Sequence, residues 1–138
     1  MDTFKPIISE AVKDINSKNV FTIMVSKLMH SILQTQAFHR QVKSLSEHLA
    51  LGDYYTSVDE LIDDIVESYQ GKNGILLDYT NYDIVNYKNN EQLIKYFENL
   101  EKDIETDRKK IKESYIQNQI DGVQELIYST LYKLRFLK

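Results

Sequence analysis

Two histidines, His39 and His48, and three acidic residues, Asp59, Asp63 and Glu67, fall within one proline-free stretch of the chain. Neutral imidazole nitrogens and carboxylate oxygens are common protein ligands for transition-metal and other divalent ions. The residue types therefore indicate a metal site. Whether they form one depends on the helices that must bring them together.

The two histidines are expected to meet across a helical hairpin. His39 continues the apolar stripe of a helix, because earlier members of the stripe recur every three or four residues. These are Val25, Leu28, Met29, Ile32 and Gln36. Ser44 and Glu47 have the spacing of a capping box, which places a chain reversal near Lys43. His39 then lies about one turn before the reversal and His48 about one turn after it. Antiparallel helices joined there should bring the imidazoles close together, with a ring nitrogen of each facing one metal ion.

The acidic residues share a broad face of the second helix with His48, whereas the third histidine, His30, lies on the opposite side of the first helix. Acidic side chains among core-directed residues are costly unless they are paired or bind a cation. Yet His48 and Asp63 are about 22 Å apart along a helix axis. Either the two clusters are separate, or a second chain running antiparallel brings its Asp63 and Glu67 to the histidine pair. The second alternative predicts a symmetric dimer with two equivalent sites.

These residues resemble a known family. His39, His48 and the Asp63-x-x-x-Glu67 pair are similar to the ferroxidase ligands of the mini-ferritins, the starvation-induced, iron-storing, DNA-protecting proteins. In that family two histidines of one subunit meet an Asp-x-x-x-Glu pair of its dimer mate. The segments HRQVKSLSEHLALGDYY and YIQNQIDGV…LYKLRFLK resemble uncharacterised ferritin-like proteins of tailed bacteriophages more closely still. The resemblance covers the chain from about residue 20 to its C-terminus.

The resemblance implies a ferritin-like protein that binds iron, or another divalent metal, and oxidises Fe²⁺ with O₂ or peroxide at an intersubunit site. Glu67 or Asp59 would bridge a second ion. Two departures concern the oxidation step: Arg40 replaces the usual tryptophan, and Gly52 replaces a carboxylate expected one turn after the second histidine. The alternative is a structural or host-interacting bacteriophage protein on a helical bundle, with no active metal chemistry.

The rest of the chain predicts the same architecture. With four glycines and one proline in 138 residues, the expected fold is all-α and a single domain: a ferritin-like four-helix bundle with a short N-terminal helix over residues 6–16 in the N-terminal segment 1–19. Bundle helices are expected over residues 20–43 and 45–69, from Asn89 or Asn90, and from Ser114. Residues 72–89 form a connection long enough to join parallel helices as a crossover. A small β-hairpin arm over residues 75–89 is the rival interpretation of this segment.

Three further details are predicted by capping and charge patterns. Ser57 and Glu60 form a second capping box, so the helix over residues 45–69 is expected to bend or restart there, and Ser114 with Gln117 forms a third. Gly71 and Gly74 are expected to end that helix. Five acids on the last two helices are candidates for a second metal site, with exposed helix acids as the simpler interpretation: Glu101, Glu105, Asp107, Asp121 and Glu125.

Composition limits the partners. The net charge of −4 disfavours nucleic acid, and no apolar run is long enough for a membrane span. The absence of cysteine excludes disulfides and thiolate metal sites. Neither a phosphate-binding glycine loop nor a hydrolase nucleophile motif is present. A chain without cysteine suits the cytoplasm, and the shared metal site predicts a homo-oligomer, at least a dimer. The resemblance to phage proteins adds the host cytoplasm or the virion as a location.

Overall fold

The computed structural model describes residues 4–80 and 82–138, with side chains from Val20 onward. The described residues form four helices and no strand. The helices are α1 (Phe4–Gln41), α2 (Leu45–Asn73), α3 (Asn90–Arg108) and α4 (Ser114–Phe136). The all-α prediction is confirmed, and within these residues the β-hairpin interpretation of residues 75–89 is wrong.

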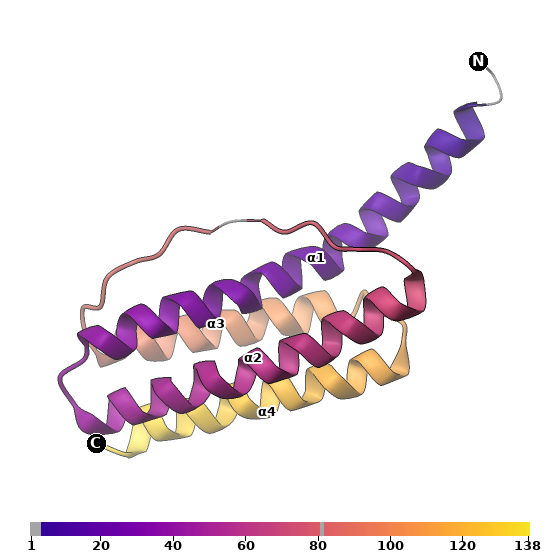
Figure 1. Cartoon of the computed structure of the whole chain (residues 1–138). Helices are drawn as coiled ribbons and strands as arrows, with labels where there is room; N and C mark the ends of the chain where they lie inside the picture. The colour runs from indigo at the N-terminus through magenta and orange to yellow at the C-terminus, as the bar shows by residue number, and fades with distance from the viewer. Residues whose placement is uncertain (1–3, 81) are drawn as a thin grey trace.

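The helices form two antiparallel hairpins, α1–α2 and α3–α4, and the crossover between them runs along the outside of α1 (Figure 1). α1 packs against α2 and α3, and α4 packs against the same two helices, so the four enclose one core. This is the four-helix bundle with a long crossover that the sequence predicted. The N-terminal turns of α1 extend beyond the other three helices (Figure 1).

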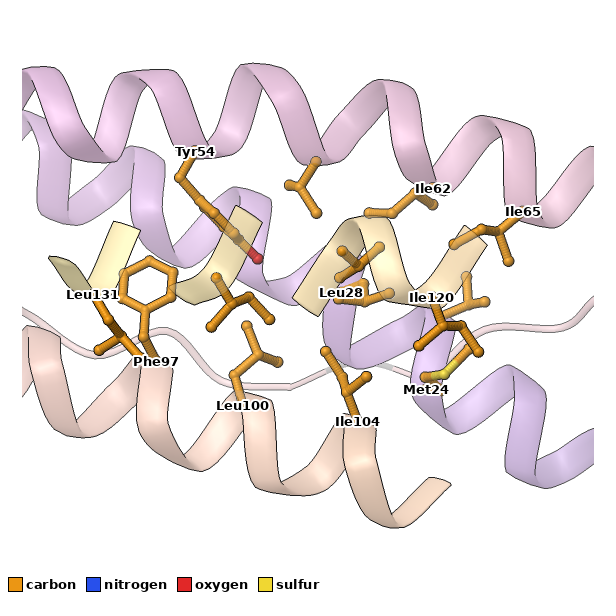
Figure 2. Packing of buried hydrophobic residues seen from close by; sticks show 14 of the residues in the cluster. Met24, Leu28, Tyr54, Ile62, Ile65, Phe97, Leu100, Ile104, Ile120 and Leu131 are labelled. Atoms are coloured by element: carbon orange, nitrogen blue, oxygen red, sulfur yellow. The ribbon is translucent and has the colours of Figure 1, made fainter. Parts of the chain in front are cut away.

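Each helix contributes one apolar stripe to the core (Figure 2). The central members are Met24 and Leu28 of α1, Tyr54, Ile62 and Ile65 of α2, Phe97, Leu100 and Ile104 of α3, and Ile120 and Leu131 of α4. Removing these side chains from water is the main driving force for assembly, at about 25 cal/mol per Å² of apolar surface. The stripes of α3 and α4 recur every three or four residues and are buried, whereas Tyr115 in the first turn of α4 is 39% exposed.

α1 differs from the prediction of a separate N-terminal helix. It continues without a break from Phe4 to Gln41, so residues 6–16 are not an element of their own. Asn16 and Ser17, at the expected end of that helix, are weak helix formers, but each disfavours a helix by no more than about 0.7 kcal/mol. No glycine or proline follows them before the turn at residues 42–44, so nothing in the sequence forces an interruption.

α2 is likewise unbroken, and the predicted restart at Ser57 is wrong. Val58, the next residue, is fully buried, so its contribution to the core outweighs the local capping signal. Gly71, predicted as part of the stop, lies inside the helix. α2 ends at Gly74, which adopts a left-handed conformation with φ of 63° and donates its N–H to the Gln70 carbonyl at 2.9 Å.

The two C-terminal helices begin differently. Asn89 caps α3 as predicted, because its side chain accepts from the Gln92 N–H at 2.8 Å. The box predicted at Ser114 does not form: Glu113 is the N-cap residue of α4 and makes no side-chain capping bond. The Gln117 side chain instead donates to the Ile111 carbonyl at 2.5 Å. This hydrogen bond joins the first turn of α4 to the α3–α4 turn and stabilises it.

Polar side chains of α1 hold the crossover by its backbone. The Gln34 side-chain amide donates to the Val85 carbonyl and accepts from the Val85 N–H, both at 2.8 Å. The Gln41 side chain accepts from the Tyr87 N–H at 2.7 Å, and the Ser26 hydroxyl accepts from the Thr80 N–H at 3.0 Å. Because these residues lie along one side of α1, they hold the crossover in place without a β-strand.

Within residues 4–80 and 82–138, none of the helices combines the length and apolar character that crossing a lipid bilayer requires.

Candidate functional site

The imidazoles of His39 and His48 lie face to face where α1 meets α2. Their ring centroids are 3.6 Å apart and their planes differ by 19°. The Tyr55 ring approaches His39 edge-on at 5.4 Å. The predicted meeting of the two histidines across the hairpin is confirmed, and both side chains are half-buried.

Each histidine is hydrogen-bonded to the other's main chain. His39 Nδ1 donates to the His48 carbonyl at 2.7 Å, and His48 Nδ1 donates to the His39 carbonyl at 2.8 Å. Since a carbonyl oxygen can only accept, both Nδ1 atoms must carry the proton. In the neutral rings, the lone pairs are therefore on the two Nε2 atoms. A metal-binding histidine usually donates its other ring N–H to a carbonyl or carboxylate in this way.

Gly52 makes the stacked arrangement possible. A Cβ atom at this position would lie 3.1 Å from His39 Cε1, closer than ordinary van der Waals contact, and 3.4 Å from His39 Nδ1. Gly52 follows His48 by one helical turn, so the face of α2 that carries His48 leaves a slot for the ring from α1. The position where the mini-ferritin resemblance implies a carboxylate is here occupied by the imidazole itself.

The turn between the helices is held independently of the histidines. Ser44 caps α2, with its hydroxyl accepting from the Glu47 N–H at 3.2 Å. The reciprocal half of the predicted capping box does not form. Glu47 is buried and accepts from the Asn90 side chain at 3.0 Å and from the Tyr87 hydroxyl at 3.5 Å, which links the turn to the start of α3.

The three predicted carboxylates stand apart from the histidine pair. Asp59, Asp63 and Glu67 are exposed and follow His48 along α2. Asp59 and Asp63 border a groove of about 290 Å³ between α1 and α2, whose wall includes Met29 and Leu33. Within one chain the predicted ligands thus form a histidine pair at the hairpin turn and a row of acids farther along the same helix.

The described part of one chain does not supply a complete metal centre. No group of three or more histidine or acidic side chains within the described residues is arranged to hold an ion. The lone pair of each Nε2 lies in the plane of its own ring, and the two stacked rings lie in separate, nearly parallel planes. The two lone pairs therefore do not converge on one point. One ring would have to rotate before both Nε2 atoms of His39 and His48 could point at one ion. The donor set suits a divalent transition metal only if further ligands come from elsewhere.

The acids of α3 and α4 are engaged in structural contacts. Glu101 and Glu105 both accept from the Gln124 side chain, at 3.2 and 2.7 Å. Asp107 pairs with Lys27 at 3.4 Å. Asp121 pairs with Arg108 at 2.6 Å, and Glu125 is exposed. These contacts fit the simpler interpretation of helix acids better than a second metal site.

His30, set aside in the sequence analysis, has a structural partner that spacing did not predict. Its Nε2 donates to the Asp83 carbonyl at 2.8 Å, and its Nδ1 then accepts from the Tyr96 hydroxyl at 3.3 Å. The Tyr96 pKa is raised well above its ordinary value, first by burial and then by the neighbouring Tyr54. His30 therefore joins α1, the crossover and α3. A crossover backbone carbonyl has no signature in the sequence, so this role could not be predicted.

Comparison with other proteins places the chain in a family. No curated protein and no solved structure matches it. A family model described as a family of unknown function (DUF5856) matches residues 39–134, which include the histidine pair, the three α2 carboxylates and the crossover. Because this match covers well over half of the sequence, the chain belongs to that family.

Proposed function

We propose that this protein is a ferritin-like metal-binding protein, in which His39 and His48 of one subunit share an ion with Asp63 and Glu67 of a second. Iron is the ion that the mini-ferritin resemblance implies, bound as Fe²⁺ and oxidised by O₂ or peroxide. Asp59 or Glu67 is the bridge to a second ion. The assembly is a homo-oligomer, in the cytoplasm of the cell or, for a viral protein, of the host.

The single observation that carries the proposal is the reciprocal bonding of the two imidazoles. Both Nδ1 atoms donate to backbone carbonyls, so the tautomer that leaves Nε2 available is already selected in each ring. For the ring that keeps its position, this selection removes part of the cost of ordering a ligand, and the bonded carbonyl would raise the basicity of its Nε2. The other ring would rotate to bring its Nε2 to the same ion.

Two features support a contribution from a second subunit. Asp63 lies too far along α2 from the histidines to share an ion with them in the same chain. It also borders the groove whose wall carries the exposed apolar side chains of Met29 and Leu33, which are 42% and 51% accessible. An antiparallel partner seated on this groove would cover that surface and present its own carboxylates to the histidine end.

The proposal is tested by complementation between two inactive chains. His48→Ala and Asp63→Ala homodimers should each lose most of their metal when loaded with Fe²⁺ under anaerobic conditions. A mixed dimer with one chain of each kind has one site with both defects and one site with neither. Metal content should therefore recover to about half of normal. Asp64→Ala, at an exposed neighbouring acid, is the matched control and should retain full metal.

Sites built within one chain would give no recovery in the mixed dimer, and that result would contradict the proposal. Circular dichroism of each variant checks that lost metal does not reflect lost helix.

A second candidate function is favoured by the same hydrogen bonds interpreted structurally. The His48 imidazole binds the His39 carbonyl in the last turn of α1, where helix carbonyls lack intrahelical partners. On this account the histidine pair stabilises the α1–α2 hairpin. The protein is then a structural or host-interacting bacteriophage protein without metal chemistry. Purified protein with no bound metal, and no Fe²⁺ uptake by the wild-type chain, would favour this candidate.

A further inference from the structure

The end of the bundle that carries the α1–α2 turn has several exposed apolar side chains. They come from the first turns of α2 and from the C-terminal end of α4, which lie together at this end (Figure 1). Leu45 is 71% exposed and Phe136 is 72% exposed. The other members are Leu49, Tyr132 and Leu137. A group of large apolar side chains left in water is typical of an interaction surface.

The same end of the bundle is basic, although the chain as a whole has a net charge of −4. The α1–α2 turn, the start of α3 and the end of α4 together contain six cationic side chains and two carboxylates, within residues 40–49, 86–92 and 132–138. One carboxylate, Glu47, is buried and hydrogen-bonded to two neighbouring side chains. The other, Glu91, is exposed.

Ion pairs do not remove this excess of positive charge. Lys133 pairs with Asp53 at 3.5 Å, and Arg135 pairs with Glu98 at 2.9 Å. The cations that form no ion pair with a described residue are all exposed: Arg40, Lys43, Lys88 and Lys138. Lys138 is not counted, because a carboxyl terminus there would cancel its charge. The other three still outnumber the single exposed carboxylate.

The neighbouring charges do not change this balance. The next charged residues along the crossover and along α3 are Asp83 and Lys95, which have opposite signs. This end of the bundle therefore combines exposed apolar side chains with net positive charge, on a protein that is otherwise acidic.

We propose that this end of the bundle docks on the surface of an anionic phospholipid bilayer. Leu45, Phe136 and Leu137 would enter the boundary between headgroups and acyl chains, with the three free cations among the anionic headgroups. Tyr132, one turn back from Phe136, would lie at headgroup level, where tyrosine is favoured. Apolar side chains beside lysine and arginine are the combination that holds peripheral proteins in this interface.

Charge and shape favour a bilayer over other occupants. A second copy docked through the same end would bring Arg40, Lys43 and Lys88 of both copies together, and like charges oppose such a contact. An acidic helix of a partner protein would need an apolar groove to receive its face. Here the apolar side chains project from the ends of two helices, and the hollow beside Leu45, of about 500 Å³, is also bordered by Ser44, Ser46 and Lys138. A fluid bilayer needs no matching groove.

The proposal does not depend on metal binding. In an antiparallel dimer the two basic ends would point in opposite directions, so each dimer would dock through one of them.

The absence of tryptophan from the chain gives the test a clean reporter. Phe136→Trp should bind vesicles of phosphatidylcholine mixed with phosphatidylserine, and its emission should shift to the blue and be quenched by brominated acyl chains. Binding to phosphatidylcholine alone should be at least about tenfold weaker, and added salt should weaken anionic binding. Leu76→Trp is the control, because Leu76 is 86% exposed beyond the other end of α2, and its emission should not change.

Variants of the exposed side chains separate the apolar and charged contributions. Leu45→Ser combined with Phe136→Ser should weaken vesicle binding by about tenfold or more. Lys43→Glu should do the same. The matched controls lie at the opposite end of the bundle: Leu76→Ser for the apolar change and Lys109→Glu, at the exposed C-cap of α3, for the charge change. Both should keep wild-type affinity, and circular dichroism should show unchanged helix in all variants.

Several results would overturn the proposal. The wild-type protein would fail to bind anionic vesicles at millimolar lipid, or binding would leave the emission of Phe136→Trp unchanged. A blue shift caused by a leucine–glutamate peptide but not by vesicles would identify an acidic protein segment as the occupant. An oligomer that ignores vesicles and dissociates in the Leu45→Ser, Phe136→Ser variant would identify a second copy. Either occupant would equally contradict the proposal.

Discussion

At the scale of single residues, Gly52 decides how His39 can sit. Replacing it by alanine should favour the helical conformation by about 1 kcal/mol. The new methyl group would, however, lie 3.1 Å from His39 Cε1. We expect the ring to shift by a few tenths of an ångström, which weakens the stack and the His39 Nδ1 bond. The weakened bond should cancel most of the gain in helix propensity, so the free energy of unfolding should change little. NMR of the imidazole N–H protons would report the bond, and chemical denaturation the stability.

Gly71→Ala is the matched control for Gly52→Ala. Nothing lies within 4 Å of a Cβ at Gly71, which is inside the same helix, so this change should stabilise the protein by about 0.5–1 kcal/mol. If Gly52→Ala stabilised the protein to the same extent and left the imidazole N–H signals in place, the steric account of this position would be wrong.

The protonation of the histidine pair gives a second prediction at this scale. Both Nδ1 atoms already carry protons, so an added proton must go to Nε2, the atom that a metal would use. Bound metal should therefore be released on acidification, because protons compete with the ion for Nε2. Metal analysis after equilibrium dialysis over a pH series measures this release. Retention down to about pH 4.5 would point to a site made of carboxylates alone.

The same residues show where sequence reasoning succeeded at the site and where it stopped. Helical spacing on either side of Ser44 was enough to predict that His39 and His48 meet. It could not predict that each ring bonds the other's carbonyl, because main-chain acceptors are identical at every position. The glycine at position 52 was visible as a departure from the mini-ferritin pattern, but its contact with an imidazole needed coordinates.

At the scale of elements, Gln34 is the main link between α1 and the crossover. Gln34→Ala removes both hydrogen bonds to Val85 and leaves a buried position unfilled, so it should cost about 2 kcal/mol of unfolding free energy. The Val85 amide should lose its protection against hydrogen exchange. Gln36→Ala is the control: Gln36 is half-buried on the groove and makes no hydrogen bond to a described residue, and Val85 should remain protected.

Periodicity predicted all four bundle helices and segment length predicted the crossover, but local signals misplaced some of the helix ends. Ser57 has the residue type and spacing of a helix start, yet α2 passes through it because Tyr54 and Val58 on either side are fully buried. A capping bond contributes about 1 kcal/mol, and burial of a core tyrosine or valine contributes more. Tertiary packing therefore overrode the local signal.

At the scale of the whole molecule, the core sets a limit on stability at high pH. Tyr54 is fully buried, its hydroxyl donates to Ser31 at 2.7 Å, and burial raises its pKa well above the ordinary value. In the unfolded chain the same phenol ionises near pH 10. Above that pH the unfolded state releases a proton that the native state keeps. Stability should therefore fall with rising pH, by about 1.4 kcal/mol per pH unit for each such tyrosine.

Tyr54→Phe tests this account. The variant should lose about 1 kcal/mol at neutral pH with the Ser31 hydrogen bond. Above about pH 10 its stability should fall less steeply than that of the wild type. Urea denaturation at neutral pH and at several alkaline values measures both effects. An identical alkaline slope in the two proteins would show that Tyr54 is not the group responsible.

The assembly of the molecule is the last prediction. The proposed ligands are divided between the α1–α2 turn and a more distant part of α2, and the side chains of Met29 and Leu33 are exposed. We therefore expect at least a dimer at micromolar concentration. Sedimentation equilibrium measures this directly, and Leu33→Glu should shift the equilibrium toward monomer. A wild-type monomer under these conditions would remove the basis for a shared metal site.

The hydrogen bonds from α1 to the crossover backbone limit how the crossover can change during evolution. Gln34 binds the main chain of Val85 and not its half-exposed side chain, so almost any residue with an N–H group could occupy position 85. Loss or gain of one residue is different, because it would reverse which backbone groups face α1. The N–H and carbonyl of Ile84, and not those of Val85, would then face the glutamines. Selection should therefore tolerate substitutions in the crossover but reject single-residue insertions and deletions within residues 83–87.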